Sequence, residues 1–124
     1  MGQEYIKGDI VMYDNKIHTI MDTLELNNYE LSYIEHPVHQ LELSGVPLTP
    51  EILEKNGWKK KMYCDWCHYL PIEGNILYLS KGVGIDGAFS VDVGQDMSYI
   101  ASISFVHQLQ HLLFGLRLNS EMEV

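Results

Sequence analysis

Residues 46–58, VPLTPEILEKNGW, are the most informative segment of this sequence. It contains the start and stop signals of one short helix. The hydroxyl of Thr49 can accept a hydrogen bond from the first helical amides, and Pro50 suits the first helical position, where no N–H is needed. Gly57 can adopt the left-handed conformation that ends a helix. We therefore expect a helix over residues 50–56 that connects two β-rich parts of the chain.

The part before this helix has the pattern of short strands. Apolar residues recur at every second position, as in Ile17, Thr19 and Met21, and two pairs of polar residues mark turns. The expected strands lie near residues 10–12, 17–21, 29–33 and 38–43. So many short strands in about 40 residues predict a small, bent sheet or an SH3-like barrel.

The part after the helix predicts a second antiparallel sheet and a final helix. Strand-like segments occupy residues 58–63, 67–70, 75–80, 88–93 and 99–103. Apolar residues then recur at spacings of three and four over 104–116, which indicates an amphipathic helix that Ser102 or Ser104 caps. The predicted fold class is α+β, mostly β. We expect one domain, 1–124, with a β-rich N-terminal subdomain at 1–45 and a second part at 46–124 that includes the final helix.

Composition restricts the class of protein. A chain of 124 residues with 46% hydrophobic residues is long enough to bury a core. Its net charge of −9 argues against general binding of DNA or RNA, which depends on neutralising phosphates. Four lysines against two acidic residues at 49–61 form one small basic island. The sequence shows no signal peptide and no apolar run of the roughly 20 residues that cross a membrane, so we expect a cytoplasmic protein without a membrane anchor.

The segment Cys64–His68 matches the C-x-x-C-H pattern of haem attachment. Haem attachment of this kind follows export, for which the chain has no signal. Zinc is the better alternative, because Cys64, Cys67 and His68 could supply three ligands and His36, His39 or a carboxylate a fourth. A second C-x-x-C or H-x-H pair is missing from the sequence, so the favoured interpretation is two ordinary reduced cysteines. We predict no cofactor.

Two further patterns have structural interpretations. Gly82–Gly87 matches G-x-G-x-x-G, but a strand-like segment follows it where a dinucleotide site needs a helix. We expect a hairpin loop there. His107 and His111 share a helix face, as in H-E-x-x-H, but Gln108 stands where the general-base glutamate is required. We expect both histidines at the core boundary, hydrogen-bonded or half exposed.

Two segments carry a resemblance to a family. VPLTPEILEKNGW (46–58) and ISFVHQLQHLLFGL (103–116) resemble segments of small proteins of Bacteroidales phages, prophages and mobile elements, and the two ends of the chain are similar as well. The resemblance implies a phage or prophage origin, with a β-rich N-terminal unit followed by an α+β part. It brings no activity and no catalytic residue. Relatives hold no fixed cysteines after the central helix, which weakens a special role for Cys64 and Cys67.

Three functions follow as hypotheses. The favoured one is a non-enzymatic phage-type protein that engages or inhibits a host or phage protein, as in counter-defence, through its acidic surface. The first alternative is an oligomeric sponge for a small nucleotide defence signal, and the second is a metal-dependent enzyme. The sponge would use a ligand site on the basic island, where lysines neutralise phosphates and an aromatic ring stacks on a base. Its candidate residues are Trp58, Lys59, Lys61 and Tyr63. The apolar final helix predicts a homo-oligomer.

Overall fold

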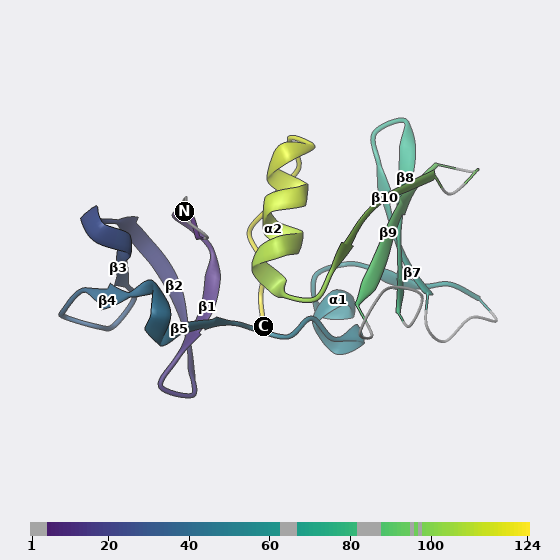
Figure 1. The fold of residues 1–124 in the computed structure, drawn as a ribbon. Helices are drawn as coiled ribbons and strands as arrows, with labels where there is room; N and C mark the ends of the chain where they lie inside the picture. Colours follow the sequence, from purple (N-terminus) through teal and green to yellow (C-terminus); the bar gives the residue numbers. More distant parts are fainter. Residues whose placement is uncertain (1–4, 63–66, 82–87, 95, 97) are drawn as a thin grey trace. The chain divides into compact units, whose positions relative to one another are not determined.

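The structure, a computed structural model, describes residues 5–62, 67–81, 88–94, 96 and 98–124 (Figure 1). Among the described residues, strands hold 45% and helices 20%, so the fold is α+β and mostly β, as predicted. Within the described ranges the strands form two antiparallel sheets of five strands each. The chain divides into two compact units. Unit 1 comprises Met1–Pro47 and Phe105–Met122, and unit 2 comprises Leu48–Ser104 and Glu123–Val124.

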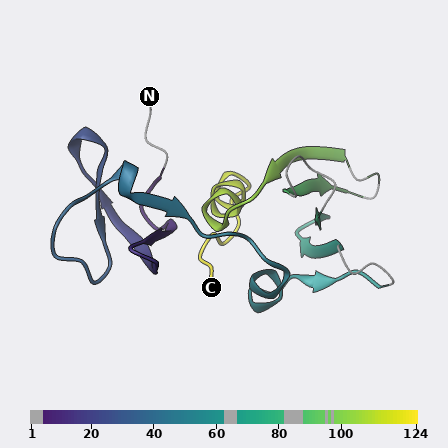
Figure 2. The same ribbon diagram turned by 60° about the horizontal axis from the view of Figure 1, so that its bottom comes forward.

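The sheet of unit 1 curves into a half-barrel (Figure 2). Its strand order is β4-β3-β2-β1-β5. The strands are β1 (Ile10–Tyr13), β2 (Lys16–Thr23), β3 (Asn28–Leu31), β4 (Val38–His39) and β5 (Leu43–Gly45). The predicted turn between β1 and β2 is present: Asp14 and Asn15 have φ of 50° and 61°. Two successive left-handed residues give a turn whose twist matches that of the strands it joins.

The core of unit 1 lies against one face of this sheet. Its largest buried member is Tyr29, whose hydroxyl donates to Gln40 Oε1 at 3.0 Å, so the phenol is satisfied inside an apolar cluster. The other buried residues of the cluster are Tyr5, Val11, Ile20, Leu31, Val38 and Leu43.

The expectation of one strand over residues 38–43 is wrong, because a 3-10 helix, η2 (Gln40–Glu42), separates β4 from β5. Side chains support the break. His39 Nδ1 accepts from the amide of Leu41 at 3.1 Å, and Glu42 Oε2 accepts from the amide of His39 at 3.2 Å. These local bonds replace strand pairing. A second 3-10 helix, η1 (Glu25–Asn27), joins β2 to β3.

The connecting helix α1 (Pro50–Lys55) confirms the capping signals and ends one residue before the expected limit. Thr49 Oγ1 accepts from the amide of Ile52 at 3.2 Å. Gly57 has φ of +90°, and the next amide, of Trp58, donates to the carbonyl of Leu53 at 3.0 Å. This bond satisfies a carbonyl of the last helical turn.

Unit 2 contains the predicted second sheet, with the strand order β10-β9-β8-β7-β6. The strands are β6 (Lys59–Lys60), β7 (Cys67–Ile72), β8 (Asn75–Lys81), β9 (Phe89–Val93) and β10 (Ser98–Ile103). Leu77, Leu79 and Val91 are fully buried on it. The expected hairpin loop at 82–87 lies outside the described residues. The strands on either side of it, β8 and β9, pair antiparallel, and a strand follows the glycines, as expected.

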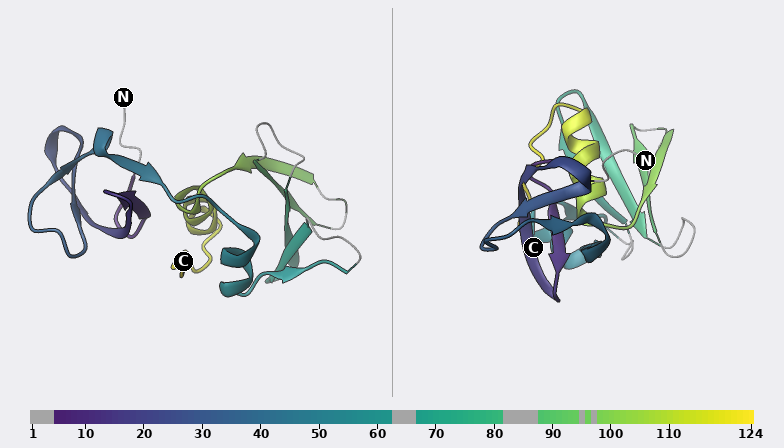
Figure 3. Two further views of the ribbon diagram at one scale, coloured as in Figure 1. Left: turned by 90° about the horizontal axis from the view of Figure 1, so that it is seen from below. Right: turned by 60° about the vertical axis from the view of Figure 1, so that its left-hand side comes forward.

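The final helix α2 (Val106–Gly115) belongs to unit 1, where it lies beside β1 (Figures 1 and 3). The expected grouping of this helix is with residues 46–104, whereas its contacts in the structure place it in unit 1. The helix begins after Phe105, whose amide donates to Gln108 Oε1 at 3.1 Å, so the predicted serine cap is wrong. None of the helices in the described ranges has the length and apolar character needed to cross a membrane.

Candidate functional site

The candidate ligand site on the basic island is not supported by the placement of its tryptophan. Trp58 is only 3% exposed, so its ring is part of the core of unit 2 and cannot stack on a base from solvent. Lys59 and Lys61 are exposed, and Lys61 Nζ lies 5.4 Å from the centre of the Tyr78 ring. Tyr63 lies outside the described residues. This part of the structure offers exposed lysines, at 59–61, on and after the edge strand β6 of the second sheet.

The alternative metal ligands Cys67 and His68 are buried members of β7. Cys67 Sγ accepts from Ser80 Oγ at 3.5 Å, and His68 Nε2 lies 3.4 Å from Glu54 Oε2. Cys64 lies outside the described residues. No group of three or more His, Cys, Asp or Glu side chains within the described ranges is arranged to hold a metal. Cys67 and His68 therefore act as packed strand residues.

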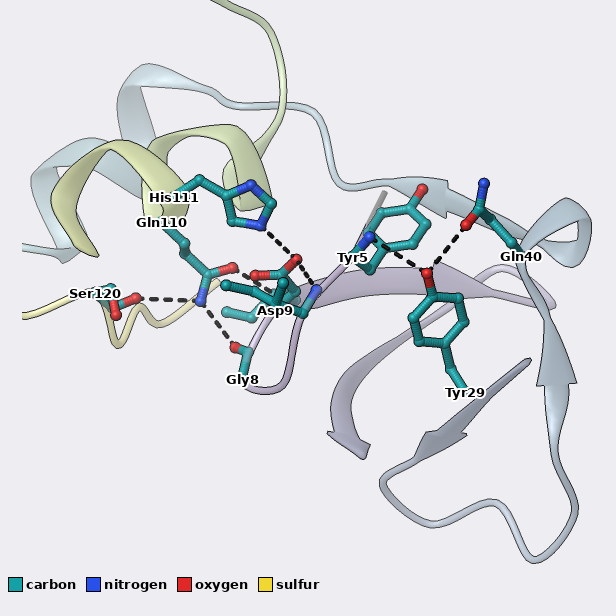
Figure 4. Close-up of polar contacts among 10 residues, drawn as sticks. Tyr5, Gly8, Asp9, Tyr29, Gln40, Gln110, His111 and Ser120 are labelled. Atoms are coloured by element: carbon teal, nitrogen blue, oxygen red, sulfur yellow. Dashed lines mark hydrogen bonds and ion pairs between the residues drawn. The ribbon is translucent and has the colours of Figure 1, made fainter. Parts of the chain in front are cut away.

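A polar cluster that the sequence analysis did not find joins the start of β1 to α2 (Figure 4). Asp9 is 2% exposed, and its Oδ2 accepts from the amide of Ile6 at 2.9 Å and lies 2.7 Å from His111 Nε2. The imidazole and the amide thus compensate a carboxylate that burial alone would penalise. Asp9 and His111 are 102 residues apart in the chain, so no local spacing indicates the pair.

Gln110 completes this cluster. Its Oε1 accepts from the amide of Ile10 at 2.9 Å, and its Nε2 donates to the carbonyls of Gly8 at 3.0 Å and Ser120 at 3.2 Å. One side chain therefore ties β1, α2 and the C-terminal segment together (Figure 4). The three bonds account for the burial of this amide, and we assign the cluster a structural role.

His107 lies on the same helix, and the expectation that it sits at the core boundary is wrong. It is buried between Phe105, whose ring stacks on it at 5.8 Å, and Tyr5, whose ring meets it edge-on at 4.9 Å. Burial lowers the pKa of His107 below 6.5. The negative charge of Asp9 opposes this shift, and His111 adds to it. The side chain is thus an aromatic core residue in its neutral form. His111, hydrogen-bonded and partly exposed, fits the expectation.

The outer face of the first sheet carries exposed apolar side chains. Along β2, His18 and Ile20 are buried, whereas Ile17 and Met21 each leave 47% of their surface in solvent. Successive strand residues point to opposite faces. The predicted alternation of Ile17, Thr19 and Met21 is therefore present, and these residues occupy the face away from the core.

The segment after β3 holds a tyrosine above this face. Tyr33 is 98% exposed and has φ of 64°, a conformation that costs a residue with a β-carbon about 1 kcal/mol. The preceding residue fixes it: Ser32 Oγ accepts from the amide of Thr19 at 2.9 Å, and the amide of Ser32 donates to the carbonyl of Thr19 at 3.0 Å. The fold thus holds a large ring in water at the end of a tethered turn. Tyr33 was expected inside a strand, and that expectation is wrong.

Two hollows meet at this tyrosine. The larger, which we call the sheet-face groove, has a volume of about 870 Å³ and is lined by Thr19, Met21, Glu30, Leu31, Ser32, Tyr33, Ile34 and Glu35. The smaller has a volume of about 340 Å³ and is lined by Tyr13, Asp14, Lys16, Ile17, His18, Tyr33 and Ile34. Tyr33 and Ile34 line both. This surface, with an apolar floor and carboxylates at its rim, is the candidate functional site.

Comparisons of the chain with protein-family models, with curated proteins and with solved structures find no match in any of the three.

Proposed function

We propose that this protein is a non-enzymatic binding protein that engages another protein through the sheet-face groove. The observation that supports the proposal is the exposure of Met21 and Tyr33 beside a hollow whose rim is acidic. The core cluster includes Ile20 and not Met21, so about half of the surface of Met21 stays available to a partner.

Contiguous exposed apolar surface with a polar rim is typical of protein–protein interaction sites, and tyrosine is enriched among residues that contribute most to binding. The rim is negatively charged here, because Glu30 and Glu35 line the groove without a lysine or an arginine among the other lining residues. A partner with apolar and basic groups fits this surface, and its positive charge would accelerate the encounter.

The resemblance to proteins of Bacteroidales phages makes a host or phage protein the expected partner. A small acidic protein that covers a basic surface of its target is suited to inhibition, including inhibition of a host defence protein. Homo-oligomerisation stays a prediction, for which the 66% exposure of Phe114 on α2 is the relevant observation.

The alternatives have less support. The nucleotide-sponge hypothesis needs an exposed aromatic ring on the basic island, and Trp58, the tryptophan proposed for this role, is buried. For the metal-dependent enzyme, Cys67 and His68 are packed in β7, and the Asp9–His111 pair is accounted for by the packing of α2 on β1.

Site-specific photo-crosslinking tests the proposal. A photoreactive amino acid replaces Met21 in one variant and Leu41, which is 87% exposed on η2, in the control. After irradiation in infected or prophage-bearing cells, we expect a defined crosslinked protein from position 21 and not from position 41. Met21→Glu should abolish co-purification of that protein, whereas Leu41→Glu should not. Equal retention by both variants would contradict the proposal.

A further inference from the structure

We infer that the sheet-face groove receives an arginine side chain of the partner protein. This inference depends on the proposed function and specifies the chemical group that the groove recognises. The floor and the rim of the groove differ in chemistry, and an arginine side chain matches both.

The floor is apolar. Met21 and Ile34 line it, and Tyr33 presents a ring that is almost fully in solvent. The three methylene groups of an arginine pack on apolar surface while the charged end stays in water. A guanidinium also stacks on the face of an aromatic ring, where the negative π-face attracts its charge. The hydrogen bonds of Ser32 to Thr19 already hold the backbone next to Tyr33 in place. Binding therefore loses little conformational entropy beyond that of the tyrosine ring.

The rim supplies negative charge. Glu30 and Glu35 are both exposed, and the carboxylate of neither forms an ion pair or a hydrogen bond with another described residue. A guanidinium presents five donors in one plane, and it therefore pairs with carboxylates while one of its faces remains free for the tyrosine. An ammonium group offers no such plane, so arginine fits better than lysine.

The smaller hollow serves as an internal comparison. It shares Tyr33 and Ile34 with the groove, but it is lined by one acid, Asp14, and one base, Lys16. The two charges offset each other, so this hollow lacks the excess of negative charge that favours a cation. We therefore expect an arginine side chain to bind in the sheet-face groove, which Glu30 and Glu35 line, and not in the smaller hollow.

Titration of the ¹⁵N-labelled full chain with single amino-acid probes tests the inference. The probes are N-acetyl-arginine amide, its uncharged near-isostere N-acetyl-citrulline amide, and N-acetyl-lysine amide. We expect the arginine probe to shift amide signals of residues 19–21 and 30–35, with an affinity roughly tenfold above that of the citrulline probe, the factor that corresponds to one charge-assisted contact. The lysine probe should bind more weakly than the arginine probe.

Variants identify the groups responsible. The double variant Glu30→Gln/Glu35→Gln should reduce the affinity for the arginine probe to that for citrulline. Tyr33→Asn, which tolerates the left-handed backbone, should remove the preference for arginine over lysine. Asp14→Asn is the control for the loss of a neighbouring charge and should leave binding unchanged. Equal binding of arginine and citrulline, or undiminished binding by the double variant, would overturn the inference.

The outcomes separate this inference from the proposed function. If Met21→Glu abolishes capture of the partner while the arginine probe does not bind, the inference fails and the proposed function stands. If the arginine probe binds as expected but capture is insensitive to Met21→Glu, the proposed function fails.

Discussion

Gly45, in β5, lies where the chain allows no side chain. A β-carbon built on this residue lies 2.6 Å from Cγ and Cδ1 of Phe105, closer than two carbons can approach. Gly45→Ala must displace that ring, and we expect a loss of about 1–3 kcal/mol of unfolding free energy. Urea unfolding followed by fluorescence measures it. In the control, Gly115→Ala at the end of α2, the new methyl meets no atom within 4 Å, so we expect a gain of about 0.5 kcal/mol. An unchanged midpoint for Gly45→Ala would disprove the close packing.

Gln110 permits a nearly isosteric test of the polar cluster. A glutamate at this position still accepts from the amide of Ile10, but it cannot donate to the carbonyls of Gly8 and Ser120. We expect Gln110→Glu to lower the unfolding free energy by about 1–3 kcal/mol, because buried partners lose their bonds and face a carboxylate. Gln108→Glu adds the same charge to the same helix while keeping the acceptor for Phe105, so its effect in the same urea titration should be much smaller. Equal effects of the two changes would assign the loss to charge alone.

His107 should make stability depend on pH. Burial lowers its pKa in the folded state below the value of 6.5 that applies to the unfolded chain. Well above pH 6.5 the residue is neutral in both states and contributes no pH dependence. As the pH falls below 6.5 the unfolded chain binds the proton more readily, so this contribution to stability is progressively lost. His107→Phe keeps a ring among Tyr5 and Phe105 and removes the titration. The urea midpoint is measured at pH 6.5 and about one unit lower. The decrease between the two pH values should be smaller for the variant than for the wild type. The same fall in both would contradict the assignment.

At the scale of single elements, α1 depends on its first hydroxyl. Thr49→Ala removes the acceptor for the amide of Ile52, and we expect a loss of about 1 kcal/mol in thermal or urea unfolding. Thr49→Ser keeps the hydroxyl and should restore most of the loss. If serine behaves like alanine, the lost methyl contact and not the cap accounts for the effect.

The success of the sequence analysis differs between elements for physical reasons. The limits of α1 and the turn at Asp14 and Asn15 were predicted because capping and left-handed turns depend on neighbouring residues alone. The prediction of one strand over 38–43 is wrong, because hydrogen bonds to the side chains of His39 and Glu42 interrupt it. The alternation of apolar and polar residues gives no sign of such bonds. The final helix was correctly predicted as an element, but its packing on β1 depends on contacts across about a hundred residues, as between Gln110 and Gly8.

The candidate site was harder to predict than the fold. Alternation along β2 places Ile17, Thr19 and Met21 on one face, which is the more apolar of the two. The structure nevertheless buries the opposite face, with His18 and Ile20. The pairing of β2 with β3, in which Ile20 lies opposite Leu31, decides which face of β2 is buried. Alternation within β2 alone does not show this pairing. Tyr33 looked like one more strand residue, because nothing in its type indicates a left-handed backbone. The residues selected for ligand binding failed at Trp58, since a tryptophan beside lysines is also a common core residue.

At the scale of the whole molecule, unit 2 is an insertion within unit 1. Residues 48–104 leave unit 1 after Pro47 and return at Phe105, and these two residues form an antiparallel bridge. Next to them the amide of Val106 donates to the carbonyl of Val46 at 2.9 Å. The points of exit and return are therefore neighbours within unit 1.

This geometry predicts that unit 1 folds without the insertion. A chain in which a short glycine-rich linker joins Pro47 to Phe105, ending at Met122, should give a dispersed NMR spectrum and cooperative urea unfolding. The same chain without 105–122 lacks the bonds of Gln110 and His111 to the start of β1, so we expect it to be substantially less stable. A disordered spectrum from the linked chain would show that unit 1 needs the insertion to fold.

The insertion also sets an order of events during synthesis. A ribosome releases β1 to β5 first, then all of unit 2, and only afterwards α2. Until α2 is present, the carboxylate of Asp9 lacks its hydrogen bond to His111, and the amide of Ile10 lacks its bond to Gln110. While unit 2 is translated, the half-barrel therefore lacks the bonds that α2 supplies, and it gains them only after residues 106–115 have followed.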